Sequence, residues 1–187
     1  MEGRSRFSEN AFGQTLYFNA EKRARGAREA RRRMFSAMLD VKGERHFDHP
    51  YKYYCEDVGL RNARTGFRRQ EPTHLMENIV YNELVLRGYS VDVGHVESTE
   101  TRDGRRQRVP REIGFVVNKP GQRVYIKSAY SLDTDEKRLK ELKPFSMTGD
   151  SFRKVIVRND VGKRWYDDTG VLNINVIGFL LEPIAIE

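Results

Sequence analysis

The sequence has few of the features that would place it outside the cell or in a membrane. Only one of its 187 residues is cysteine, so no disulfide can form within the chain, and we expect Cys55 to be a small core residue. No apolar run approaches the roughly 20 residues that a membrane-spanning helix needs. The first ten residues, MEGRSRFSEN, lack the apolar segment of a secretory signal. These absences predict a cytoplasmic protein with no membrane partner.

The phosphate-binding loops of nucleotide-binding proteins are also missing. A Walker A loop has the pattern G-x-x-x-x-G-K-[ST], whose backbone amides and lysine surround the phosphates. The only Gly-Lys pair, Gly162-Lys163, is followed by Arg164, and Val157 stands where the first glycine belongs. No G-x-G-x-x-G pattern occurs. The sequence therefore predicts that the chain neither binds nor hydrolyses ATP by itself and holds no cofactor.

Groups of metal-ligating residue types are sparse. His46, Asp48 and His49 lie close together in the sequence, and His74 precedes Glu77 by three residues. Two-ligand spacings of this kind are common by chance, whereas a zinc site uses three or four ligands. We interpret these histidines as ordinary surface or core residues and predict no metal site.

The positive charge of the chain lies mostly near its N-terminus. The net charge is +7, and residues 1–34 hold nine basic and four acidic residues, whereas the rest of the chain holds 25 and 23. We expect residues 1–20 to be poorly ordered and residues 21–38 to form a basic helix. It would be either a solvated tail, the favoured reading, or an arm that contacts DNA phosphates. The candidate phosphate-binding residues are Lys22, Arg23, Arg25, Arg28, Arg31, Arg32 and Arg33.

Hydrophobic periodicity and turn residues predict one mixed domain at residues 40–187, after a basic segment at 1–39. A helix is expected from Thr73, as N-cap, to Arg87, with Gly88 at C′. A second, charged helix is expected at 133–143. Strands are expected at 89–95, 112–118, 123–129, 154–158 and 171–176. A hairpin-like turn is expected around Gly43, an exposed hairpin connection at 98–111, a Pro120-Gly121 turn and a closing segment at 177–181. This order indicates an α/β (α+β) fold, a mixed sheet flanked by helices.

Several stretches resemble one family of domains. They are DVKG (40–43), KYYCEDVGLRNA (52–63), EPTHLMENIVYNELVLRGYSVDVG (71–94), EIGFVV (112–117) and YIKSAYSL (125–132). Together they resemble the domain of unknown function 4143, which forms the C-terminal domain of many prokaryotic AAA-type ATPases and has a PD-(D/E)XK restriction-endonuclease-like fold. The resemblance covers the chain from about residue 40 onward. It implies a parent protein with an ATPase module and a winged helix.

The resemblance also implies where a nuclease site would lie. In such nucleases, carboxylates converge on Mg²⁺, which activates a water molecule. The family's helix acid corresponds to Glu77, its strand aspartate to Gly114, and its Glu-x-Lys pair to Lys127 and Ala129. Glu112 is the remaining carboxylate, expected on the same strand face as Gly114 because side chains alternate with period 2. The site is therefore expected to be degenerate and catalytically inactive.

Two questions stay open at this point. Lys127 either pairs with Glu77, which is expected to lie close to it, or extends to solvent. The chain itself is either a non-catalytic accessory or interaction domain, whose partner is an ATPase module or another protein, or a nucleic-acid-binding module that uses the basic arm. An active metal-dependent nuclease is the least favoured reading.

Overall fold

The computed structural model describes residues 33–36, 38–41, 45–46, 52–67, 71–102 and 104–182. Several predictions lie outside these residues, among them the poor order of residues 1–20, the helix over residues 21–32 and the phosphate-binding role of Lys22 to Arg32. Arg33 is the first residue of β1 (Arg33–Ser36).

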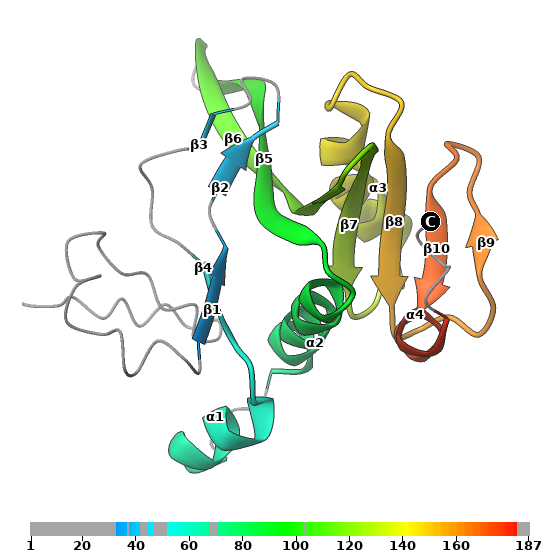
Figure 1. Ribbon diagram of the computed structural model, residues 1–187. Helices are drawn as coiled ribbons and strands as arrows, with labels where there is room; N and C mark the ends of the chain where they lie inside the picture. The colour runs from blue at the N-terminus through cyan, green and yellow to red at the C-terminus, as the bar shows by residue number, and fades with distance from the viewer. Residues whose placement is uncertain are drawn as a thin grey trace, which may run out of the picture.

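The described chain forms a mixed sheet with helices on its two faces (Figure 1). The other strands are β2 (Met38–Asp40), β3 (Arg45–His46), β4 (Lys52–Cys55), β5 (Ser90–Arg102), β6 (Arg105–Lys119), β7 (Gln122–Ala129), β8 (Arg153–Arg158), β9 (Trp165–Tyr166) and β10 (Leu172–Asn175). The helices are α1 (Val58–Arg64), α2 (Pro72–Leu86), α3 (Asp135–Ser146) and α4 (Val176–Leu181). This architecture confirms the predicted α+β class with a mixed sheet flanked by helices.

The main sheet has the strand order β3-β2-β5-β6-β7-β8-β10-β9. Its centre is antiparallel from β5 through β6 to β7, and parallel from β7 through β8 to β10. At one end β2 joins β5 in parallel and pairs antiparallel with β3; the turn predicted around Gly43, between β2 and β3, lies outside the described residues. A separate two-stranded sheet is made by β1 and β4.

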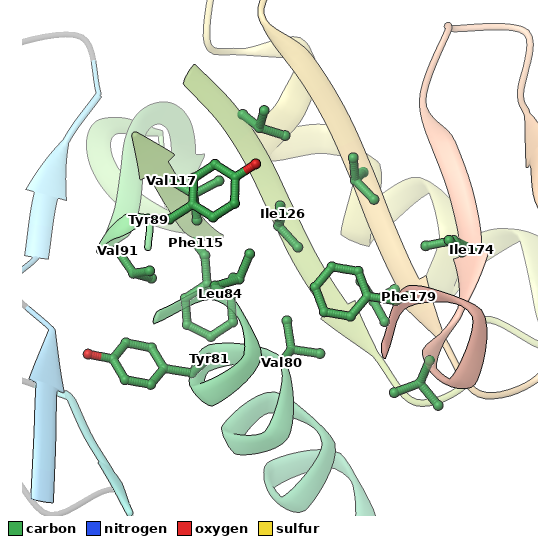
Figure 2. Packing of buried hydrophobic residues seen from close by; sticks show 14 of the residues in the cluster. Val80, Tyr81, Leu84, Tyr89, Val91, Phe115, Val117, Ile126, Ile174 and Phe179 are labelled. Atoms are coloured by element: carbon green, nitrogen blue, oxygen red, sulfur yellow. The ribbon is translucent and has the colours of Figure 1, made fainter. Parts of the chain in front are cut away.

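Each face of the sheet carries its own hydrophobic core, because buried strands alternate their side chains between faces. Helices α2 and α4 cover one face, where Tyr81, Leu84 and Phe179 meet Phe115 and Ile126 (Figure 2). Helix α3 covers the other face. Its Phe145 packs with Ile113, Val116, Tyr125 and Ile156. The α2 face and the α3 face are therefore distinct environments for the polar residues that follow.

Several predicted boundaries are wrong in detail. The helix predicted for residues 21–38 is contradicted at its end, because residues 33–36 and 38–40 are strands, and β2 spans the predicted domain boundary. Helix α2 has Glu71 rather than Thr73 as N-cap, since Pro72 suits the first helical turn; Gly88 follows its C-cap as expected. Residues 177–181 lie in helix α4. The hairpin expected at 98–111 is confirmed, since residues 98–102 of β5 pair antiparallel with residues 105–109 of β6.

Candidate functional site

Helix α2 holds strand β4 through two asparagine side chains. Asn78 accepts a hydrogen bond from the Cys55 backbone N–H at 2.9 Å and donates to the Cys55 carbonyl at 2.8 Å, so its amide acts like a neighbouring strand. One turn further on, Asn82 donates to the carbonyls of Cys55 at 2.9 Å and Glu56 at 3.0 Å. The E-N-x-x-x-N part of the motif on which the resemblance rests therefore has a structural role.

Replacing Asn78 with alanine is expected to destabilise the fold. The change leaves the Cys55 amide without its side-chain acceptor and removes one of the two asparagine donors to the Cys55 carbonyl, and Asn78 is itself buried. A loss of about 2–3 kcal/mol follows from the cost of burying unpaired polar groups. Urea unfolding followed by circular dichroism measures it. Asn62→Ala on α1 is the comparison, because the Asn62 side chain makes no hydrogen bond within the described part of the chain. An equal loss there would contradict the role of Asn78.

The same docking brings Lys52 between two carboxylates. Lys52 and Tyr54 are two residues apart on β4 and both reach Glu77 on α2. The Lys52 Nζ lies 3.2 Å from Glu77 Oε1 and 2.6 Å from Glu112 Oε1. The Tyr54 hydroxyl donates to the same Glu77 oxygen at 2.8 Å. One ammonium group thus bridges the two carboxylates that the sequence assigned to the degenerate site.

The electrostatics of this bridge favour a permanently charged lysine. Burial alone would lower the pKa of Lys52, but the carboxylates of Glu112 and Glu77 outweigh it and raise the pKa above its ordinary value. Burial, followed by the charge of Glu77, raises the pKa of the Tyr54 hydroxyl, which therefore remains a hydrogen-bond donor. The ring of Tyr54 stacks on Tyr81 with centroids 4.0 Å apart, which fixes the hydroxyl in place.

Neither expectation for Lys127 is correct. Its Nζ lies 2.7 Å from Glu141 Oε2 on α3 and donates to the backbone carbonyl of Glu112 at 3.1 Å. Its side chain is mostly buried, with 14% exposed, so it does not extend into water. The reason is strand alternation: Lys127 lies between Tyr125 and Ala129, both of which pack on the α3 face. Glu77 belongs to the opposite side of the sheet.

Gly114 and Glu112 do not share a strand face, because β6 carries a bulge between them. Gly94 pairs with Gly114, but the next residue of β5, His95, pairs with Glu112, so Ile113 is extra. Gly114 has φ +108°, and a Cβ on it would lie 2.6 Å from the Ile126 carbonyl oxygen. The expectation of alternating faces fails here because a bulge resets the alternation.

The five positions implied by the resemblance therefore do not form one site. Glu77 and Glu112 meet through Lys52 on the α2 face, whereas Lys127 and Ala129 face α3 and Gly114 lies against β7. Sequence reasoning missed Lys52, although its period-2 spacing from Tyr54 was a usable signal. It also missed Glu141, which lies in the predicted charged helix.

The candidate metal ligands are only partly described. His74 lies on α2 with its Nε2 3.6 Å from Glu71 and its Nδ1 3.9 Å from Glu77. The side chains of His46, Asp48 and His49 are outside the described residues. Within the described part of the chain, no three His, Cys, Asp or Glu side chains group as a metal site would require. No described helix is long and apolar enough to cross a membrane.

Comparison with known proteins gives one distant relative. An uncharacterized protein of Haemophilus influenzae is 28% identical over 138 residues, which is 74% of this chain but 30% of that protein. The chain thus spans about a third of the length of the curated relative it matches. It matches no family model. No solved structure matches it significantly.

Proposed function

We propose that this chain is a non-catalytic accessory domain, related to the C-terminal domains of prokaryotic AAA-type ATPases and acting in the cytoplasm with an ATPase module or another protein. The observation that carries the proposal is the Lys52 bridge. Its ammonium group lies within 3.2 Å of Glu77 and 2.6 Å of Glu112, the two carboxylates left at the expected nuclease site. The bridge has a structural role, because it links β4 to α2 and to β6.

The charge arrangement opposes metal-dependent hydrolysis. Metal catalysis of phosphodiester cleavage needs several oxygen ligands around the cation. Here the ammonium of Lys52 lies where a cation shared by Glu77 and Glu112 would lie, and like charges repel. A second ammonium, that of Lys127, donates to the Glu112 carbonyl at 3.1 Å. Both faces of this part of the sheet therefore present positive charge toward Glu112.

The length of the relative supports an accessory role. A related stretch makes up 30% of a longer protein, so this sequence unit occurs together with other parts. From the resemblance to ATPase-associated domains, we expect those parts to include an ATPase module. An ATPase with a Walker A loop, encoded beside this chain and co-eluting with it in size-exclusion chromatography, would support the proposal. The absence of any such neighbour would count against it.

The inactive site is tested by metal binding and by plasmid cleavage. We expect the unmodified chain to show no Mn²⁺ binding at low millimolar concentration by electron paramagnetic resonance, because Lys52 competes for both carboxylates. We also expect supercoiled plasmid to stay intact with Mg²⁺ or Mn²⁺. Heat-treated protein and an EDTA reaction control for contaminating nucleases. Mg²⁺-dependent cleavage that is lost in Glu77→Ala would show that the proposal is wrong.

A further inference from the structure

Beyond the sheet, β5 and β6 continue as a two-stranded ribbon, which we define as residues 96–102 and 105–112. Strand β7 pairs with β6 only from Phe115 onward, and β2 pairs with β5 only as far as His95. Within the described chain, the two strands of the ribbon therefore pair only with each other. Figure 1 shows the ribbon rising to the upper left, away from β7. The bulge at Gly114 is the point at which β6 leaves the sheet.

The ribbon has an inner and an outer face. Val96 and Ser98 are buried on the inner face. The outer face is exposed and carries two adjacent cross-strand pairs, in which Thr101 lies opposite Arg106 and Thr99 opposite Arg108. Arg105, at the tip, is exposed as well. The outer face thus combines guanidinium groups with hydroxyl groups.

Positive charge is concentrated at the tip of the ribbon. Residues 101–108 contain four arginines and one aspartate. Residues 35–187 hold 25 basic and 23 acidic residues, so without the tip 21 basic and 22 acidic residues remain. The domain would carry a net charge of −1 without the tip.

Three exposed arginines near the tip, Arg105, Arg106 and Arg108, are bound weakly or not at all by carboxylates of the described residues. Arg105 and Arg106 contact no carboxylate among the described residues. Arg108 lies 3.3 Å from Glu97, but these side chains are 80% and 49% exposed, and such pairs contribute little. By contrast Arg111, further down the ribbon, is bound to Glu100 and Ser98.

We propose that the ribbon binds double-stranded DNA, with its tip in the major groove and its arginines on the phosphates. The major groove is about 12 Å wide and admits a two-stranded ribbon. Arg106 and Arg108 are roughly 6.7 Å apart along the strand, which suits contacts to successive phosphates. Threonine hydroxyls donate to phosphate oxygens as well. Duplex RNA fits less well, because the major groove of A-form RNA is deep and narrow. This activity is additional to the accessory role and does not depend on the Lys52 bridge.

The test is the salt dependence of binding to a fluorescein-labelled 20-base-pair DNA, measured by fluorescence anisotropy with the full chain between 50 and 200 mM KCl. The unmodified chain is expected to bind. Each phosphate contact contributes about 0.9 to the slope of log affinity against log salt, so Arg106→Gln/Arg108→Gln should reduce the slope by about 1.8. Across this fourfold range of salt, the variant's affinity should then change about twelvefold less.

The matched control is Lys163→Gln/Arg164→Gln, which removes the same charge from exposed residues at the β9 end of the sheet. As in the ribbon variant, one of the two substituted cations lies beside a carboxylate, since Arg164 is 2.8 Å from Glu182. Its slope should equal that of the unmodified chain. Thermal melting checks that every variant is folded.

A third variant, Arg25→Gln/Arg28→Gln, separates the ribbon from the basic N-terminal segment. A reduced slope in the ribbon variant, with the control unchanged, supports the proposal whatever the third variant does. Three outcomes overturn it: no binding by the unmodified chain at 50 mM KCl, equal slopes for the ribbon variant and the unmodified chain, or equal binding of duplex RNA of the same length.

Discussion

Gly114→Ala should destabilise the fold by about 2–6 kcal/mol, a large part of the roughly 5–15 kcal/mol that stabilises a typical domain. Gly114 has φ +108°, a conformation that costs other residues about 1–3 kcal/mol. The added methyl group would also lie 2.6 Å from the Ile126 carbonyl oxygen and 3.2 Å from the Lys127 Cα. Those are backbone atoms of a central strand, so relieving the clash requires β6 and β7 to move apart, which adds about 1–3 kcal/mol.

Urea unfolding monitored by circular dichroism measures this loss. Gly121→Ala is the matched control, because Gly121 also has positive φ, +77°, but an added Cβ there would meet nothing within 4 Å. That variant should lose only about 1–2 kcal/mol, the cost of the backbone conformation. If the two variants lose the same amount, the steric contact with Ile126 is not important and the explanation is wrong.

The same geometry bears on a latent nuclease. Restoring the family pattern would require Gly114→Asp, Lys127→Glu and Ala129→Lys. Aspartate at 114 meets the same backbone clash as alanine, and residues 127 and 129 face α3 while Glu77 lies on the α2 side. The three substitutions would therefore not place their groups beside Glu77. The geometry therefore predicts that these substitutions would not create a nuclease site around Glu77.

The sequence predicted the fold better than the site. Sequence patterns located α2 and the central strands, because the apolar residues of α2 recur every three to four positions and the central strands are short apolar runs bounded by turn residues. The elements near the N-terminus failed: residues 33–40 have the composition of a helix, and pairing with β4 and β5 makes them strands. Local propensity cannot express such long-range pairing.

The site failed for a related reason. Assigning Glu112 and Gly114 to one face assumed unbroken alternation, and the bulge at Gly114 ended it. Assigning Lys127 to Glu77 required knowing on which side of the sheet each helix packs. Glu141 and Glu77 lie 14 and 50 positions away from Lys127 in the sequence, and the topology decides which of the two carboxylates Lys127 meets.

The second large effect is expected from removing the charge of Lys52. Lys52→Met keeps the length of the side chain but leaves Glu77 and Glu112 beside each other without a cation. Breaking a buried ion pair costs about 3–5 kcal/mol. Lys52 is 13% exposed, Glu77 20% and Glu112 38%, so water screens part of the effect. We therefore expect a loss of about 2–3 kcal/mol at pH 7, below the range for fully buried pairs.

Two variants make this result specific. Lys137→Met breaks a pair with Asp133 in which both side chains are largely exposed, at 57% and 61%, and should leave the stability nearly unchanged. Adding Glu112→Gln to Lys52→Met removes one of the two repelling charges and should recover part of the loss. If the double variant is as unstable as the sum of its single variants, the loss comes from packing and not from charge.

The pH dependence gives an independent check with a definite sign. The folded-state pKa of Lys52 lies above its ordinary value of 10.5, because the two carboxylates outweigh the effect of burial. A group whose pKa is raised on folding binds its proton more tightly in the folded state, so its stabilisation is complete below the unfolded-state pKa. The difference in unfolding free energy between the unmodified chain and Lys52→Met should therefore be constant from pH 8 to about 10 and shrink above pH 10.5. A difference that instead grows with alkaline pH would mean that Lys52 is not held by Glu77 and Glu112.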